Sequence, residues 1–173
     1  KLKIGSRPVK EDVAHVAAIK AALTEYGSQI RVDVNQAWDE ATAIIGMRGL
    51  EDAGIDLVEQ PVKAHQLDVL ARLNARFEIP ILADESVATA INGYTLARSA
   101  CARAYALKIA KAGGPLGTLE LAHVAQAAGI GLYGGTMLEG SIATAASVHT
   151  YAVLPQLEWG TELFSPLLLK DDI

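Results

Sequence analysis

Residues 80–85 read PILADE, an almost wholly apolar run that ends in two acidic residues. A strand that is apolar at successive positions is buried on both faces, as in a parallel sheet covered by helices. Comparable runs recur roughly 25 to 30 residues apart, the length of a strand, a helix and two loops. The strands that we predict are residues 1–4, 30–34, 55–60, 80–85, 104–110, 131–136 and 159–164.

Apolar residues recur at helical spacing between these runs. In the first interval they are Val9, Val13, Val16 and Leu23, and in the third they are Leu67, Leu70, Leu73 and Phe77. Successive strand–helix units without a hairpin signal predict an α/β fold, a TIM-type (β/α) barrel, with a doubly wound open sheet as the alternative. Seven strands are one fewer than such a barrel needs. We therefore expect strands two to eight in one partial barrel domain, residues 1–173, with the first strand outside this chain.

The composition excludes several classes of protein. A net charge of -5 without a basic run argues against nucleic-acid binding. The single cysteine, Cys101, excludes an internal disulfide and is expected to be a small buried residue. Residues 140–157 carry no charge and have the length of a membrane span, but their polar residues, Gly and Pro favour a buried helix. No signal peptide is visible, so we expect a cytoplasmic protein that does not bind membranes.

Acidic residues stand at the ends of three consecutive predicted strands. Asp33, Glu59 and Asp84 are spaced by 26 and 25 residues, one repeat each. In barrels of this type the carboxyl ends of the strands carry the catalytic groups, so these carboxylates should lie side by side. Clustered carboxylates repel one another unless a cation joins them, and oxygen ligands favour Mg²⁺ or Mn²⁺. The alternative is that each acid caps the helix that follows it.

Lysines stand at two further strand ends. In KLKIG, residues 1–5, Lys1 and Lys3 project to the same face of an extended chain, opposite Leu2. An exposed edge strand would explain them, but the predicted carboxylates offer opposing charge. Lys108 ends the strand four positions further round the predicted barrel, so Lys3 and Lys108 should face each other across the metal. Glu162 on the last strand is expected to bind a lysine or the substrate, or only to cap the structure.

The loop GGTMLEGS, residues 134–141, follows the strand at 131–136. Backbone amides near Thr136 and Met137 could hold a substrate carboxylate, or the glycines serve only a tight turn. Residues 129–134 also match GxGxxG, but they follow a helix and enter a strand, the reverse of the dinucleotide-binding context. The four histidines share no ligand spacing, and we interpret them as structural: His15, His65, His123 and His149.

These motifs together resemble the enolase superfamily, specifically its muconate-lactonizing branch. The segments that carry the resemblance are KLKIG, VDVNQAW, IDLVEQP, ILADES, LKIAKAGGP and YGGTMLEGS, which span practically the whole chain. The resemblance implies the roles of several residues, starting with metal ligation by Asp33, Glu59 and Asp84. It further implies an acid/base role for Lys3, an electrostatic role for Lys1, and partners of the ligands and lysines at Asn35 and Glu85. The superfamily's other arrangement, a His base on the seventh strand, is disfavoured because this strand has no His.

By this resemblance, the protein interconverts cis,cis-muconate and muconolactone through an enolate. Mn²⁺ or Mg²⁺ would stabilise the enolate, and Lys3 would exchange a proton with the α-carbon. The resemblance also implies an N-terminal capping domain outside this chain, a small dicarboxylate substrate and a homo-oligomer, with an octamer as one possibility.

Other functions remain open from the sequence. Chloromuconate cycloisomerisation, dipeptide epimerisation or racemisation, and o-succinylbenzoate synthesis fit the same lysines and carboxylates. A Schiff-base aldolase that uses Lys108 belongs to another enzyme class and needs no metal. The non-enzyme alternative is an inactive barrel fragment.

Overall fold

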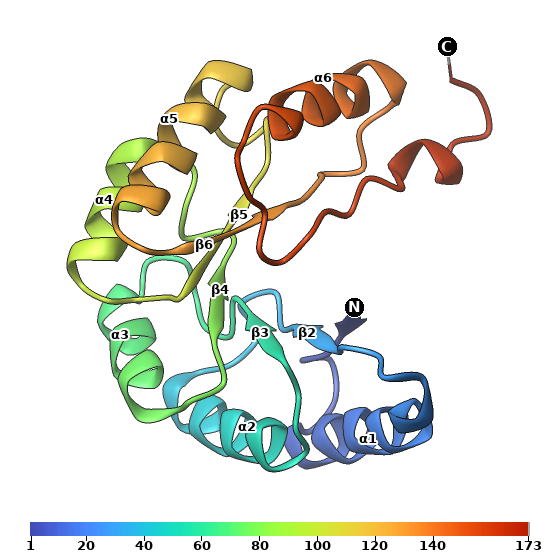
Figure 1. Ribbon diagram of the computed structural model, residues 1–173. Coiled ribbons are helices and arrows are strands. Elements are labelled where there is room, and N and C mark those ends of the chain that lie inside the picture. The colour runs from blue at the N-terminus through green and yellow to red at the C-terminus, as the bar shows by residue number, and fades with distance from the viewer. Residues whose placement is uncertain (173) are drawn as a thin grey trace. The chain divides into compact units, whose positions relative to one another are not determined.

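Strands alternate with helices along residues 1–172, the part of the chain that the computed structural model describes. The chain, coloured by residue number in Figure 1, divides into two compact units. Unit 1 comprises residues 1–86 and 99–103, and unit 2 comprises residues 87–98 and the chain from residue 104 onward. The predicted α/β alternation is confirmed, and each unit is described by itself below.

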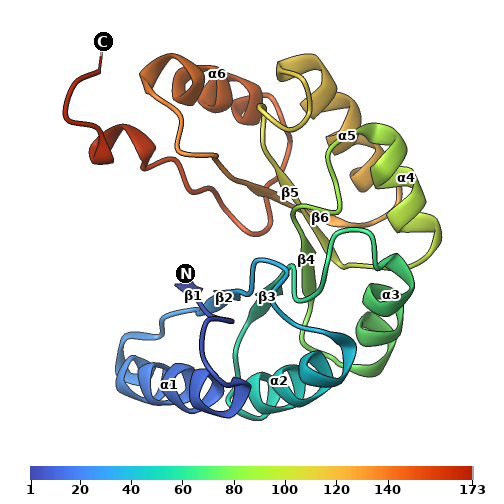
Figure 2. The same ribbon diagram turned by 180° about the vertical axis from the view of Figure 1, so that it is seen from behind.

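Unit 1 holds four parallel strands that pair in chain order. They are β1 (Leu2–Lys3), β2 (Arg31–Asp33), β3 (Leu57–Glu59) and β4 (Ile81–Ala83). The helices of this unit are α1 (Val9–Ala22), α2 (Glu40–Asp52), α3 (Leu67–Arg76) and the 3-10 turn η1 (Thr24–Tyr26). Helices α1 and α2 lie side by side in both views (Figures 1 and 2).

Local sequence explains where these helices lie. Helix α2 begins after Asp39, whose carboxylate accepts a hydrogen bond from the N–H of Thr42 at 2.7 Å and so caps the first turn. Helix α3 buries Leu70 and Leu73, as their spacing predicts, and Phe77 is buried directly after the last turn. The apolar pattern therefore predicts correctly which face of α3 is buried.

The register of unit 1 aligns the ends of its strands in one row. Lys3 pairs with Asp33, Asp33 with Glu59, and Glu59 with Leu82. Side chains in one row of a sheet share a face, and residues two apart along a strand return to it. Lys1 precedes Lys3 by two residues and Asp84 follows Leu82 by two, so the sheet directs the candidate groups of this unit to one side.

Unit 2 holds the parallel strands β5 (Ala104–Leu107) and β6 (Gly131–Gly134). Its helices are α4 (Ala90–Arg98), α5 (Pro115–Ala127) and α6 (Ser141–Ala152), followed by the 3-10 turn η2 (Ser165–Leu168). Helices α4 and α5 lie side by side (Figure 2). The buried Tyr105 hydroxyl donates to the carbonyl oxygen of Gly93 at 2.8 Å and so ties β5 to α4.

The predicted strand at residues 159–164 is not formed as a strand. Only a parallel bridge between Thr161 and Gly134 remains of it. Gly160 has a φ of 71°, and this left-handed residue interrupts the extended backbone that a strand requires. The segment still lies along β6, because Glu162 N–H donates to the carbonyl oxygen of Gly134 at 2.8 Å.

The prediction of a buried helix within residues 140–157 is wrong in one respect. Helix α6 forms, but only Ser147, Thr150 and Tyr151 are buried in it, and Ile142 is 71% exposed. Apolar composition does not determine which face of a helix the rest of a chain covers. Among the described residues, no helix has the length and apolar character needed to cross a membrane.

Candidate active site

Three buried carboxylates follow one another at the strand ends of unit 1. Asp33 ends β2, Glu59 ends β3, and Asp84 follows β4 directly. Their exposed fractions are 1%, 0% and 3%. Ionised carboxylates are almost never buried to this extent without a cationic or hydrogen-bonding partner. Helix α2 begins after Asp39 and helix α3 after Gln66, so the helix-cap alternative does not explain Asp33 or Glu59.

Two lysine amines meet these carboxylates. The Lys1 ammonium lies 3.0 Å from Asp33 Oδ2 and 2.9 Å from Glu59 Oε2, and the Lys3 ammonium lies 2.8 Å from Asp33 Oδ2. The side chain of Lys1 is only 15% exposed, whereas that of Lys3 is 68% exposed. One amine is thus enclosed with the carboxylates and the other is accessible to a ligand.

Burial and charge shift two pKa values in this cluster. Burial, together with the charges of Asp33 and Asp84, raises the pKa of Glu59 to about 7, although Lys1 opposes the shift. Burial lowers the pKa of Lys1, but the charges of Glu59 and Asp33 outweigh burial, so its pKa is raised overall. Lys1 therefore stays an ammonium ion at neutral pH.

Asn35 and Glu85 lie beside this cluster, and the roles that the resemblance implies for them stay predictions. Asn35 Oδ1 accepts from the Lys3 ammonium at 2.6 Å, and Asn35 Nδ2 donates to Glu85 Oε1 at 3.4 Å. The backbone N–H of Asn35 donates to Asp33 Oδ1 at 3.0 Å. Lys3 is therefore oriented by a carboxylate and a carboxamide, and Asn35 connects it to Glu85.

The chemistry of the donors in unit 1 fits a divalent cation, although their arrangement is not closed around one. Glu59 Oε2 is buried and accepts no hydrogen bond, despite its ion pair with Lys1. Within residues 1–172, no group of three or more His, Cys, Asp and Glu side chains is placed to hold a metal ion. The Lys1 ammonium lies between two of the carboxylates and supplies a single positive charge there. Buried oxygen donors with excess negative charge match the ligand preference of Mg²⁺ or Mn²⁺.

Unit 2 carries the remaining predicted residues. Lys108 follows β5 and is 8% exposed, and Glu162 Oε2 accepts a hydrogen bond from the Tyr133 hydroxyl. Tyr133 on β6 is 1% exposed, and we did not predict a role for it. Tyr133 lies on an apolar strand, and nothing in that pattern indicates that its hydroxyl binds Glu162, which is 29 residues away in the chain. The predicted facing of Lys3 and Lys108 stays a prediction, because they belong to different units.

Gly135 leaves room for the side chain of Lys108. A Cβ atom at Gly135 would lie 3.0 Å from Lys108 Cε and 3.2 Å from the Tyr133 ring. Tyr151 on α6 supports the same place, with its hydroxyl 2.7 Å from the carbonyl oxygen of Leu107 and 2.9 Å from that of Gly135. The ends of β5 and β6 are therefore held together beside the Lys108 stem.

Two residues of the loop predicted to hold a substrate carboxylate contact other groups of the chain. The N–H of Met137 donates to Glu139 Oε2 at 2.6 Å, and Thr136 Oγ1 lies 3.1 Å from the hydroxyl of Ser165. The N–H of Ser141, at the start of α6, donates to Asp172 Oδ2 at 2.8 Å. Binding of a substrate carboxylate by these amides stays a prediction.

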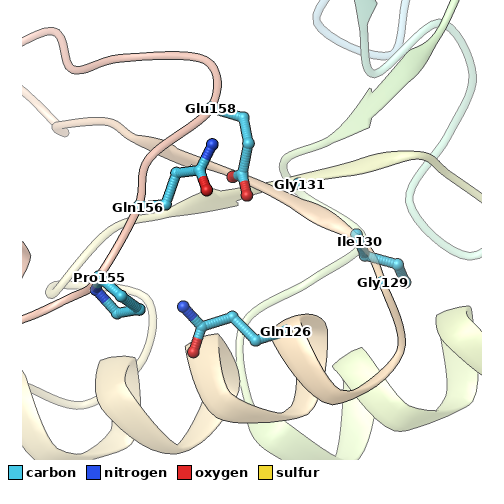
Figure 3. Close-up of a pocket in the computed structure, with 7 residues that line it drawn as sticks. All are labelled: Gln126, Gly129, Ile130, Gly131, Pro155, Gln156 and Glu158. Carbon is cyan, nitrogen blue, oxygen red and sulfur yellow. The ribbon is translucent and has the colours of Figure 1, made fainter.

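A cavity of about 470 Å³ lies at the opposite end of β6, between residues 129–131, residues 155–158 and Gln126 (Figure 3). It contains none of the predicted site residues. Gly131 and Gly134 bound strand β6 itself, which supports the rejection of the dinucleotide-binding fingerprint.

The histidines and the cysteine stand apart from the candidate site. All four histidines are exposed: His15, His65, His123 and His149. Cys101 is fully buried, as predicted, and its thiol donates to the carbonyl oxygen of Leu67 at 3.3 Å.

Comparison with known proteins identifies the family. The family model "Enolase C-terminal domain-like" matches residues 1–173. The chain belongs to the enolase C-terminal domain-like family. This membership confirms the predicted resemblance to the enolase superfamily and the fold class, part of a TIM-type (β/α) barrel.

Several relatives of this enolase-family chain have names that describe isomerases. Muconate cycloisomerase 1 of Pseudomonas putida is 53% identical over 173 residues, which are 100% of this chain and 46% of the relative. Chloromuconate cycloisomerase of Delftia acidovorans is 45% identical over 171 residues, 99% of this chain and 46% of the relative. The chain thus spans just under half the length of these relatives.

A solved structure supports the same kinship. The muconate lactonizing enzyme of Pseudomonas fluorescens, solved in complex with muconolactone, has a TM-score of 0.95 and 54% identity to this enolase-family chain. The match covers 99% of this chain and 46% of the solved one. The predicted likeness to the muconate-lactonizing branch is therefore confirmed.

Proposed function

We propose that the full-length protein, with whatever residues flank this chain, is a metal-dependent cycloisomerase that interconverts cis,cis-muconate and muconolactone. The observation that carries the proposal is the pair of lysine amines on buried carboxylates in unit 1, one enclosed and one accessible. Relatives named muconate cycloisomerase and the solved muconolactone complex support this substrate.

The proposal gives Lys1 and Lys3 different roles. Lys1 is held between Asp33 and Glu59 with a raised pKa, so it contributes a fixed positive charge. Lys3 has an exposed stem and only one carboxylate partner, so its amine can reach a bound molecule. Lys3 is therefore the group that gives a proton to the α-carbon of an enolate, and removes it in the reverse direction.

The neighbours of Lys3 hold its amine in place. Asp33 and Asn35 accept two of its three N–H bonds, and Asn35 is in turn bound to Glu85. The remaining N–H is the one available for transfer. A fixed amine at the reacting carbon avoids the entropic cost of bringing it there during the reaction.

Asp33, Glu59 and Asp84 would hold the Mn²⁺ or Mg²⁺ ion. When bound, such an ion stabilises negative charge that develops on the substrate's carboxylate oxygens. Ligation of the ion by all three residues requires their carboxylates in the ionised form, which the raised pKa of Glu59 opposes in the metal-free protein.

Residues of unit 2 also have proposed roles. We assign Lys108 the second lysine role that the resemblance implies, and Glu162, whose carboxylate accepts a hydrogen bond from the Tyr133 hydroxyl, the role of an acidic partner of a lysine or of the substrate. The amides of Thr136 and Met137 would bind a substrate carboxylate, which would replace Glu139 at the Met137 amide. A homo-oligomer is part of the proposal, in keeping with the 51% hydrophobic composition.

Spectrophotometric assay of the full-length protein with cis,cis-muconate tests the function. We expect turnover with Mn²⁺ and loss of turnover with EDTA. Lys3→Ala should reduce turnover by about 10³-fold or more while Mn²⁺ binding persists, and Lys3→Arg should also fail because guanidinium stays protonated. Lys63→Ala, which removes an exposed lysine of the same unit, is the matched control and should keep full turnover. Near-normal turnover by Lys3→Ala would refute the assignment.

A chloromuconate substrate is the second candidate, since a relative 45% identical bears that name. The ratio of kcat/KM for 2-chloromuconate and cis,cis-muconate decides between them. Failure on both, with epimerisation of a dipeptide or formation of o-succinylbenzoate, would favour those superfamily reactions instead. Borohydride trapping of substrate on Lys108 without metal would indicate the aldolase.

A further inference from the structure

We propose that Gln60 is a positioning residue that sets the place of the Asp84 carboxylate in the metal site proposed above. Gln60 follows Glu59 directly, at the end of β3, and is 0% exposed. Its side chain does not contact the carboxylates themselves in any hydrogen bond described for it. It acts instead on the backbone that presents one of them.

The Gln60 carboxamide bridges two loops. Its Oε1 accepts from the N–H of Asp84 at 3.0 Å and from that of Ser86 at 3.1 Å. Its Nε2 donates to the carbonyl oxygen of Val62 at 2.9 Å and to Ser86 Oγ at 2.7 Å. A carboxamide offers two N–H bonds and two lone pairs. All four are used, so the side chain has one orientation and one position.

The backbone of Gln60 is held just as firmly, in an uncommon conformation. Its φ is 37°, in the left-handed region that costs a non-glycine residue on the order of 1 kcal/mol or more. Its N–H donates to the carbonyl oxygen of Leu82 at 3.0 Å, and its own carbonyl oxygen accepts from Gln36 N–H at 2.8 Å. Such a conformation persists only where surrounding contacts determine it. Gln60 is therefore a fixed point between the chain ends of β3 and β4.

The position of the Asp84 backbone depends on Gln60. It follows the last residue of β4, and the carbonyl group that holds its N–H belongs to a side chain from the neighbouring strand. Metal–oxygen distances must be met to within about 0.2 Å. A shift of a few tenths of an ångström in the loop of residues 84–86 would thus weaken the binding of a cation by the Asp84 carboxylate. Residues that orient ligands in this way commonly change metal affinity by about 10- to 100-fold.

The test compares Mn²⁺ affinity, measured by electron paramagnetic resonance on the full-length protein, in three variants. Gln60→Met keeps the volume and removes all four hydrogen bonds, and should weaken Mn²⁺ binding by about tenfold or more. Ser86→Ala is the matched control, because it removes the hydroxyl bonded to Gln60 but leaves the Gln60–Asp84 hydrogen bond. It should change the affinity by less than about threefold, even where it lowers the unfolding temperature.

Gln60→Glu keeps the proposal testable if the Met variant does not fold. The carboxylate retains an oxygen for the N–H groups of Asp84 and Ser86 but cannot donate to Val62. It should lose stability yet bind Mn²⁺ within about threefold of wild type or more tightly. Equal affinities of Gln60→Met and wild type overturn this inference alone, as does a loss of more than about threefold in Gln60→Glu relative to wild type. Absence of Mn²⁺ binding in the wild type overturns the proposed metal site and this inference with it.

Discussion

The change Tyr151→Phe removes one buried hydroxyl and nothing else. That hydroxyl lies 2.7 Å from the carbonyl oxygen of Leu107 and 2.9 Å from that of Gly135. Burial raises the pKa of Tyr151, so the hydroxyl keeps its proton and remains a donor at neutral pH. Without it, Leu107 O still accepts from the N–H of Gly135 at 2.8 Å, whereas Gly135 O loses this donor. A lost hydrogen bond and one poorly satisfied buried carbonyl should lower the free energy of unfolding by about 2 kcal/mol.

Urea unfolding of the full-length protein measures this difference, with the slope of the transition checked for constancy. The matched control is Tyr94→Phe on α4, whose side chain is 60% exposed and whose change should stay within about 0.5 kcal/mol. If Tyr151→Phe were as neutral as Tyr94→Phe, the hydroxyl would not be what joins the ends of β5 and β6. A cost above about 4 kcal/mol would also contradict the reasoning, because the ring itself would then have moved.

Two further predictions concern unit 1. The pKa of Glu59 is raised to about 7 in the metal-free protein, so below that pH a proton competes with the cation for this carboxylate. The affinity for Mn²⁺ should therefore fall between pH 8 and pH 6, by up to about tenfold per pH unit below pH 7. An affinity that does not change with pH would contradict the placement of Glu59. Cys101 is fully buried and burial raises the pKa of its thiol, so Ellman's reagent should modify the native protein on the order of 100-fold more slowly than the urea-unfolded protein, and a fast native reaction would contradict its burial.

The repeat explains how much of unit 1 could be predicted. Asp33 and Glu59 lie one repeat apart, and parallel strands with equal connections meet in matching register, so the two residues become direct pairing partners. The same reasoning places Lys3 opposite Asp33. Periodicity therefore predicts which residues share a row of the sheet, because the row is a property of the backbone.

Two kinds of feature were not predicted. One is the backbone conformation of a single residue, and the other is the hydrogen bond between side chains and groups far apart in the chain. Gly160 interrupts the strand expected at residues 159–164 through a positive φ that no alternation of apolar residues reveals. Tyr133 finds Glu162 29 residues away, and Tyr151 reaches Leu107 over a separation of 44. The sequence shows that these hydroxyls are present, but the identity of the acceptor depends on how neighbouring repeats pack.

In unit 1, side chains that follow one strand hold the loop that follows the next strand along the chain. Gln36, just after β2, accepts from the N–H of Ala64 in the loop after β3, and Gln60, just after β3, holds Asp84 after β4. The Ser86 hydroxyl closes this series, since it donates to the carbonyl oxygen of Ala64. Each loop is thus fixed by a carboxamide from the preceding strand. The backbone hydrogen bonds of a parallel sheet end where its strands end, so side-chain hydrogen bonds of this kind hold the loops beyond, which carry the candidate site residues. The backbone that presents the Asp84 carboxylate is therefore held by a residue that lies one repeat earlier in the chain.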